Sequence, residues 1–187
     1  MGRSKLTAKQ RHSLRGKKFQ KNKLARLHGK LWKLFSIHVR AGAADWRGYV
    51  TCFTCPKRDH WRTFDAGHYK HGVMDFNPKN VNPQCSGCNR FWHGRLDEYA
   101  SRLIKTYGVE ILDELDKGAN EERLRRTQTG NAYLPESEYL ELITKYEQLT
   151  KEFRNRFSHE GHYPWPELNA ADQEAKIKEE LTKRGVL

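Results

Sequence analysis

Residues 52–55 read Cys-Phe-Thr-Cys and residues 85–88 read Cys-Ser-Gly-Cys, and the 187-residue chain has no other cysteine. Two Cys-x-x-Cys turns can present four thiolates to one tetrahedral Zn²⁺ ion. The predicted zinc ligands are therefore Cys52, Cys55, Cys85 and Cys88. Because the protein would fill all four positions, we expect the zinc to be structural rather than catalytic. Its removal should unfold the centre of the chain.

Disulfides and redox chemistry are the competing interpretations of these cysteines. The N-terminus is basic but lacks the apolar stretch of a secretory signal. A cytoplasmic location is therefore expected, and a reducing cytoplasm disfavours disulfides. A redox Cys-x-x-Cys motif would not require its duplicate.

The segments beside the cysteines carry residue types that can do chemistry. Residues 64–69 read Phe-Asp-Ala-Gly-His-Tyr, and residues 80–94 read Asn-Val-Asn-Pro-Gln-Cys-Ser-Gly-Cys-Asn-Arg-Phe-Trp-His-Gly. A strand carrying His68 and a helix starting near Cys85 and carrying Asn89 would form a small cleft. His93 follows Asn89 by four residues, so we expect the two side chains on one helical face.

The positive charge of the chain is concentrated upstream. Lys and Arg number 35 and Asp and Glu 23; residues 1–44 contain 13 basic residues and no acidic one. Residues 45–95 contain eight basic and four acidic residues, and residues 96–187 contain 14 and 19. Such a basic segment suits phosphate neutralisation with counterion release, so nucleic acid is the predicted partner. The alternative is a merely solvated tail, although solvating surfaces usually mix both signs.

Apolar periodicity predicts a mostly helical protein. Helices are expected at about residues 22–40, ending at Ala41-Gly42, at 96–107 with a continuation to 115, and from Pro135 to about 157. Short strands are expected at Tyr49–Phe53 and Trp61–Phe64. We expect residues 1–20 to be unstructured without a partner, 116–132 to be a flexible connection, 158–169 to be a loop, and a short helix to follow from Asn169 to Gly185. The chain has no run of about 18 apolar residues, so no membrane span is expected.

These motifs also carry a family resemblance. Four strings carry it: Asp-Ala-Gly-His-Tyr at residues 65–69, Asn-Val-Asn-Pro-Gln-Cys-x-x-Cys-Asn at 80–89, His-Gly at 93–94 and Tyr-Ala-x-x-Leu-Ile-x-x-Tyr-Gly-x-Glu-x-Leu-Asp-Glu-Leu at 99–115. Together they closely resemble the phage NinG proteins, also called Rap recombination endonucleases. That family looks like a branch of the HNH, or ββα-metal, nucleases and is similar to phage endonuclease VII. The resemblance covers roughly residues 30–116. If the chain is phage-encoded, the expected cytoplasm is that of the host cell.

What the resemblance implies is a structure-selective endonuclease acting on branched DNA. His68 would take the place of the general base, Asn80 would brace the loop that orients this base, and Asn89 would bind a catalytic Mg²⁺ or Mn²⁺ ion. The family often has a metal ligand immediately before the base, where this chain has Gly67. Asp65 is the nearest carboxylate and is the expected second metal ligand, with His93 as a further candidate.

Each of these residues also has a structural interpretation. His68 could pack on an aromatic ring or cap a turn. His93 could contact a phosphate or stack on Trp92. Asn89 could satisfy a backbone group in the first turn of a helix. Asp65 could pair with Arg62 or Lys70.

The predicted fold class is α+β and mostly α, with a zinc-stapled ββα-metal core, flanking helices and a basic N-terminal arm. The predicted division is a basic arm and DNA-binding helix in residues 1–44, a nuclease core in 45–116 and a helical extension in 117–187. The predicted function is a metal-dependent endonuclease for Holliday junctions and D-loops in phage recombination. The alternative is a non-catalytic, zinc-ribbon-like DNA-binding accessory protein. A two-fold substrate is compatible with a homodimer that uses the apolar faces of residues 96–115 or 135–157.

Overall fold

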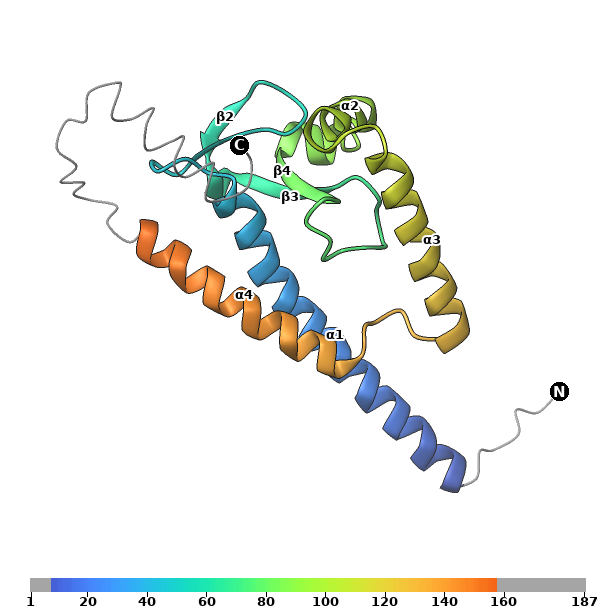
Figure 1. Cartoon of the computed structure of the whole chain (residues 1–187). Coiled ribbons are helices and arrows are strands. Elements are labelled where there is room, and N and C mark those ends of the chain that lie inside the picture. Colours follow the sequence, from blue (N-terminus) through green and yellow to red (C-terminus); the bar gives the residue numbers. More distant parts are fainter. Residues whose placement is uncertain (1–7, 158–187) are drawn as a thin grey trace. The chain divides into compact units, whose positions relative to one another are not determined.

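The longest element of the protein is helix α1 (Ala8–Gly42), shown in Figure 1. The structure is a computed structural model that describes residues 8–157. The helix ends at Gly42, as predicted, but it begins well before residue 22, so the expectation of an unstructured segment up to residue 20 is wrong for residues 8–20. Lys, Arg, Gln, Ala and Leu dominate this stretch, and their high helix propensity extends the helix without an apolar face. Residues 1–7 lie outside the described part.

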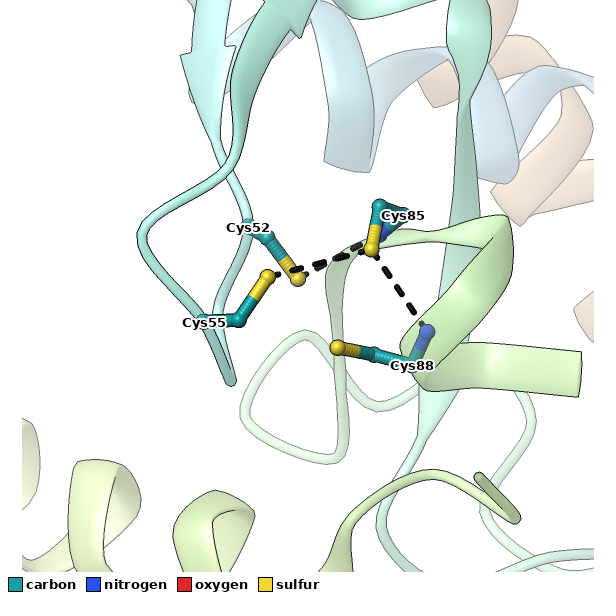
Figure 2. A group of neighbouring side chains, drawn as sticks. All are labelled: Cys52, Cys55, Cys85 and Cys88. Carbon is teal, nitrogen blue, oxygen red and sulfur yellow. Dashed lines mark hydrogen bonds between the residues drawn. The ribbon is translucent and has the colours of Figure 1, made fainter. Parts of the chain in front are cut away.

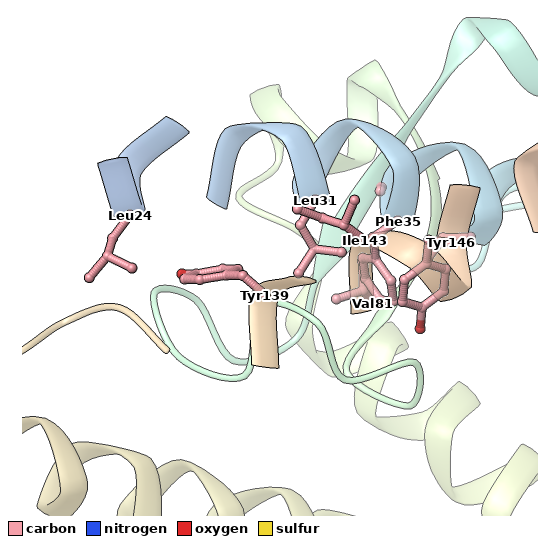
Figure 3. Close-up of a cluster of buried hydrophobic side chains, with 9 residues drawn as sticks. Leu24, Leu31, Phe35, Val81, Tyr139, Ile143 and Tyr146 are labelled. Atoms are coloured by element: carbon pink, nitrogen blue, oxygen red, sulfur yellow. The ribbon is translucent and has the colours of Figure 1, made fainter. Parts of the chain in front are cut away.

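Helix α4 (Glu136–Phe157) packs along α1 and forms the main apolar core with it. Figure 3 shows Leu31 and Phe35 of α1 meeting Tyr139 and Ile143 of α4. Leu31 and Phe35 are completely buried, and their four-residue spacing places both on one helical face. Two ion pairs flank this core, Lys23 with Glu136 at 2.5 Å and Lys30 with Glu147 at 2.7 Å. A helix after Pro135 is therefore confirmed.

Two small antiparallel sheets lie beside α1. Strand β1 (Tyr49–Thr51) pairs with β2 (Arg58–His60), and β3 (Phe64–His68) pairs with β4 (Val81–Cys85). A 3₁₀ turn, η1 (Trp61–Thr63), joins β2 to β3, so the expected strand at 61–64 begins only at Phe64. A five-residue π-helix, η2 (Gly87–Phe91), follows β4. In the second sheet Phe64 lies opposite Cys85 and His68 opposite Val81.

Helices α2 (Leu96–Tyr107) and α3 (Ile111–Thr129) complete the described part. The expected flexible connection at 116–132 is wrong, since α3 continues through it to Thr129. A side chain at residue 118 would place its Cβ 2.7 Å from the Met74 Cε. Gly118 therefore lets α3 approach closely the loop between β3 and β4 that carries Met74. Glu122 also pairs with Arg125 and Arg126, one turn further along, and such pairs stabilise a helix.

The apolar stripes of the C-terminal helices are buried within the chain. Tyr99 and Leu103 of α2 pack with Ile111 and Leu115 of α3, and the stripe of α4 faces α1. Both faces suggested for a dimer interface therefore contribute to the cores of one protomer. The homodimer itself stays a prediction.

The described residues confirm a mostly helical α+β fold with small sheets. They belong to one compact unit, in which α1 and α4, from the first and third predicted segments, pack together. No helix among residues 8–157 is both long and apolar enough to cross a bilayer. The loop predicted at 158–169 and the short helix predicted after it lie outside the described residues.

Truncation of Phe35 tests the packing of α1 on α4. We expect Phe35→Ala to lower the free energy of unfolding by about 3–5 kcal/mol, because it leaves a cavity at a fully buried position. Urea unfolding followed by circular dichroism measures the change. Phe19→Ala on the same helix, where the ring is 71% exposed, is the matched control and should change the stability by no more than about 0.5 kcal/mol. Equal losses in the two variants would contradict this core.

Candidate functional site

The four cysteines converge on one point between the two sheets (Figure 2). Their sulfur atoms all lie within 4.8 Å of one another, and the Cys55 and Cys85 sulfurs are 3.8 Å apart. Tetrahedral zinc with Zn–S bonds of about 2.3 Å requires sulfur separations of roughly 3.8 Å. All four cysteines are free thiols. The cluster could therefore hold a zinc ion, as the spacing predicted.

The local backbone prepares these thiols for a cation. The Cys85 amide donates to the Cys52 sulfur at 3.3 Å, and the Cys88 amide donates to the Cys85 sulfur at 3.5 Å. Burial raises the pKa of Cys52, but the backbone hydrogen bonds from Cys85 and Thr54 outweigh it and bring this pKa below its ordinary value. A lowered pKa favours the thiolate that zinc binds, and among the four cysteines this holds for Cys52. Burial raises the pKa of Cys55 to about 12 and also raises that of Cys85. Through the cluster, the turn after β1 is connected to the end of β4 and to η2.

Helix η2 brings Asn89 against strand β3. The Asn89 amide nitrogen donates to the Asp65 Oδ2 at 3.2 Å, so two of the predicted site residues are in direct contact. Arg90, the next residue, forms a bidentate pair with the same carboxylate, with distances of 2.8 Å from Nε to Oδ2 and 2.6 Å from Nη2 to Oδ1. The partner of Asp65 is thus Arg90 rather than Arg62 or Lys70, and Lys70 pairs with Asp116 instead.

The charge of Asp65 is set by competing effects. Burial raises the pKa of this carboxyl, but the hydrogen bonds from Arg90 and Asn89 outweigh burial, so the pKa lies below its usual value. Asp65 is therefore ionised at neutral pH. An ionised carboxylate beside an amide oxygen is a donor set that suits Mg²⁺ or Mn²⁺. A cation on Asp65 would have to replace Arg90, and Asn89 would have to present its Oδ1.

The packing around residue 67 explains why this position is a glycine and carries no metal ligand. A Cβ at residue 67 would lie 2.0 Å from the Oε1 of Gln84 and 3.0 Å from the Oδ1 of Asn89. Gln84 is completely buried and donates to Thr54 and to the carbonyl of Gly94. The space beside residue 67 is thus already occupied, and no side chain fits there. Because the Asn89 Oδ1 is also close to this position, the side-chain amide of Asn89 lies next to Gly67, the residue that precedes His68.

His68 lies on the other side of β3 from Asp65, because it is three positions further along and side chains alternate along a strand. Its ring stacks on Trp32 of α1 with centroids 4.9 Å apart and an angle of 18° between the planes. Among the described residues the Nε2 atom has no hydrogen-bond partner, and the nearest carboxylate oxygen, Asp75 Oδ1, is 3.7 Å away. Burial lowers the pKa of His68, Asp75 opposes this effect, and His71 adds to it. His68 is therefore neutral at pH 7.

Asn80 holds the loop between β3 and β4. It is completely buried; its Oδ1 accepts from the Lys70 amide at 2.7 Å, and its Nδ2 donates to the carbonyls of Lys70 at 3.1 Å and Met74 at 3.2 Å. This loop carries Asp75, whose Oδ2 also lies 3.2 Å from the Nε2 of His28 in α1. Asn80 thus fixes the position of the carboxylate that lies beside His68.

His93 is not on the same helical face as Asn89. Helix η2 ends at Phe91, and His93 has a left-handed backbone with φ of 46° in an exposed turn. The expected shared face required a longer helix, and the hydrogen bond from the Gly94 amide to the Cys88 carbonyl closes a turn instead. A metal-binding role for His93 stays a prediction without geometric support.

Residues of α1 complete the site, and sequence reasoning missed them. A cleft of about 240 Å³ lies between α1, β3 and η2. Its lining combines Asp65, Asn89 and Arg90 with neighbouring residues of α1 and β3, namely Trp32, Ser36, Arg40, Phe64 and Ala66. Arg40 donates to the Phe64 carbonyl at 3.0 Å. No spacing pattern in the sequence distinguishes Trp32 and Arg40 from the other residues of the helix. Their contacts, with His68 and Phe64, join segments more than 20 residues apart.

Removal of the metal tests the structural role of the cysteine cluster. After chelation we expect the amides of residues 49–60 and 85–94 to lose protection from hydrogen exchange, because these short elements have little core of their own. The amides of α1 and α4 around Phe35 and Ile143 should keep their protection, since that core contains no cysteine. Cys88→Ser should reproduce the pattern without a chelator. Unchanged protection around η2 would contradict the assignment.

Comparison with known proteins identifies relatives among phages. The family model described as "Bacteriophage Lambda NinG protein" matches residues 2–155. "Protein ninG" of Escherichia phage lambda is 36% identical over 64 residues, which are 32% of this chain and 31% of that protein. "Protein ninG" of Escherichia phage 933W is 30% identical over 96 residues, or 49% of this chain and 43% of that protein.

The matched region thus spans less than half the length of these curated relatives, and no solved structure matches the chain. The family model, in contrast, covers all of α1, continues into α4 as far as residue 155, and includes the cysteine cluster, Asp65, His68, Asn80 and Asn89. On this match, the chain belongs to the NinG family of bacteriophage lambda.

Proposed function

We propose that this protein is a structure-selective, metal-dependent DNA endonuclease that cleaves branched DNA, such as Holliday junctions and D-loops, in phage recombination. One observation carries the proposal. The antiparallel pair β3–β4 and the following helix η2 bring the Asn89 amide against Gly67, the residue before His68, and beside the Asp65 carboxylate. A base and a pair of oxygen ligands then belong to one strand–strand–helix unit, as an HNH-type site requires. Because His68 and Asp65 point to opposite sides of β3, the proposal requires the scissile phosphate to lie where it can reach both sides of this strand.

His68 is the proposed general base. It takes a proton from a water molecule whose oxygen attacks the phosphorus, and the bond to the 3′ oxygen breaks, which leaves a 3′-hydroxyl and a 5′-phosphate. The ring is neutral at pH 7, as a base must be. Because Trp32 covers the ring and Nε2 is buried, water reaches this nitrogen only when α1 shifts on binding DNA.

Asp65 and Asn89 are the proposed holders of the catalytic Mg²⁺ or Mn²⁺ ion, which when bound stabilises negative charge on the phosphate and on the leaving oxygen. A cation on Asp65 releases Arg90, and the freed guanidinium is then available to a DNA phosphate beside the cleft. Zinc has no part in this chemistry, since the cysteines fill its coordination shell.

The outer face of α1 is the proposed contact to the DNA backbone. Lys18, Lys21, Arg26 and Lys33 are exposed on this helix, whereas Lys23 and Lys30 are paired with glutamates of α4. The basic residues that the fold leaves unpaired with α4 therefore supply the phosphate contacts. Binding should weaken steeply as salt rises.

One observation favours a second function, that of a non-catalytic DNA-binding recombination accessory protein. Arg90 already neutralises Asp65 through two hydrogen bonds, and a carboxylate held in this way needs no cation. The basic face of α1 serves this function equally well. The two proposals differ in whether a phosphodiester bond is broken.

Nicking of a synthetic four-way junction in Mg²⁺ tests the proposal directly, with a linear duplex of equal length as the control substrate. We expect His68→Ala to lower the cleavage rate by about 10²–10⁴-fold, the usual contribution of a general base. The dissociation constant for the junction should stay within about twofold, because His68 makes no proposed phosphate contact.

His60→Ala is the matched control, since this histidine lies on β2, in the other sheet from His68. Its rate should stay close to that of the unaltered protein. Junction binding without any cleavage in Mg²⁺ or Mn²⁺ would reject the nuclease and leave the accessory protein. Equal loss of binding and cleavage in His68→Ala would make His68 a structural residue.

The pH dependence of cleavage tests the base. Burial holds the pKa of His68 below its ordinary value of 6.5, so the base stays neutral at pH 6.5 and the rate should fall only at lower pH, as the ring becomes protonated. Asp75→Asn removes a negative charge that raises this pKa, so its acidic limb should move to still lower pH. Trp32→Ala exposes the ring and should move the limb back towards 6.5. An acidic limb that neither variant moves would assign the titration to another group.

A further inference from the structure

Two adjacent aromatic side chains are exposed where η2 ends. Phe91 is the last residue of the helix and is 76% exposed, and Trp92 is 61% exposed. The aromatic residues of the core, such as Phe35 and Tyr99, are fully buried. The pair, which we name the aromatic tip, has no part in the zinc cluster or in the proposed cleavage step.

The aromatic tip is held rigidly. The Trp92 amide donates to the Gly87 carbonyl at 3.0 Å, and the Gly94 amide donates to the Cys88 carbonyl at 2.9 Å. From inside the protein, Gln84 donates to the Gly94 carbonyl at 2.7 Å. These bonds connect the tip directly to a cysteine of the zinc cluster.

The backbone is also strained in this turn. His93 and Arg95 both have left-handed φ angles, 46° and 48°, which are unfavourable for residues with a side chain. Strain of this kind persists where the surrounding structure imposes it, and it is concentrated at functional sites. The two left-handed residues lie directly after the exposed rings of Phe91 and Trp92.

Positive charge flanks the aromatic tip. The Arg95 guanidinium lies 5.6 Å from the Trp92 ring centroid, and Arg90, whose side chain is 66% exposed, directly precedes Phe91. Asn89 and Arg90 line the cleft beside β3, so the tip begins where the cleft ends. Arg90 is paired with Asp65 and Arg95 with Glu98, so an occupant that combines a flat apolar face with negative charge would share these guanidinium groups with the two carboxylates.

We propose that the aromatic tip stacks on an unstacked base at the branch point of a DNA junction. This inference rests on the proposed action on branched DNA and names the element that recognises the branch. Every base has a π-face, and apolar side chains next to cations commonly insert at distorted base steps. A branch point interrupts base stacking, so an exposed ring can enter there without first opening the duplex.

A second copy of the chain is a poorer occupant. Two aromatic side chains bury about 150–250 Å² each. The pair therefore supplies at most about 500 Å², below the roughly 800 Å² that each partner of a stable complex usually buries. A base, in contrast, is matched in size by one or two rings.

The experiment uses the full-length, zinc-loaded protein and two substrates, a four-way junction with 2-aminopurine at the crossing and a linear duplex with the same label. Fluorescence anisotropy and 2-aminopurine emission are recorded without Mg²⁺ or Mn²⁺, so that no cleavage occurs. We expect the double variant Phe91→Ala/Trp92→Ala to bind the junction about tenfold to a hundredfold more weakly, the loss typical of base–aromatic stacking. Its affinity for the duplex should stay within about twofold, and the emission change at the crossing should disappear.

Tyr107→Ala removes another exposed aromatic ring, on α2, and should leave both affinities unchanged. Trp92→Phe, which keeps a ring, should retain most of the preference for the junction. Equal zinc content and equal thermal stability of the variants would show that the fold is retained.

An unchanged junction preference in the double variant would overturn the inference, as would equal weakening on both substrates or a lack of DNA binding by the unaltered protein. A dimer in sedimentation that dissociates in the double variant would assign the tip to a second copy and overturn it too. Cleavage in Mg²⁺ is scored separately. A protein whose tip recognises the branch but which cleaves nothing would refute the nuclease and leave the inference intact.

Discussion

The convergence of four thiols on one point is the constraint on which the rest of the site depends. The two cysteine pairs are separated by 29 residues, and the elements that carry them are too short to be stable alone: β1 and β2 have three residues each and η2 has five. Asn89 and the aromatic tip follow Cys88 directly. If the sulfur atoms were not held together, nothing in the local sequence would keep the Asn89 amide beside Asp65, or Phe91 and Trp92 in solvent.

Helix α1 supplies the second constraint, because one helix serves both the core and the site. Leu31 and Phe35 pack against α4, whereas Trp32 stacks on His68 and Arg40 binds the start of β3. A displacement of α1 would therefore alter the main core, the cleft and the exposure of His68 together. The same helix carries the basic face proposed for DNA, so binding of phosphates and access to the base are coupled through one rigid element.

Local patterns predicted the parts of the fold that depend on local chemistry. The spacing of the cysteines predicted the cluster, and Gly42 and Gly108 predicted the ends of α1 and α2. Of the cleft expected between the strand and the helix, the structure brings together Asp65 and Asn89, but His68 is not among the residues that line it. What the sequence could not reveal depends on contacts between distant segments. Trp32 stacks on His68, and His28 lies within hydrogen-bond distance of Asp75. Helix α3 can pack against Met74 only because residue 118 is glycine. The error at His93 has a local cause, since a π-helix of five residues changes direction before the expected turn is complete.

X-ray absorption at the zinc edge of the purified protein tests the central claim most directly. The account predicts one zinc per chain with four sulfur neighbours at about 2.3 Å and no nitrogen or oxygen in the first shell. A shell that contains nitrogen or oxygen, or a folded protein that binds no zinc, would contradict it. In either case the clamp that holds η2 against β3 would have to be sought elsewhere.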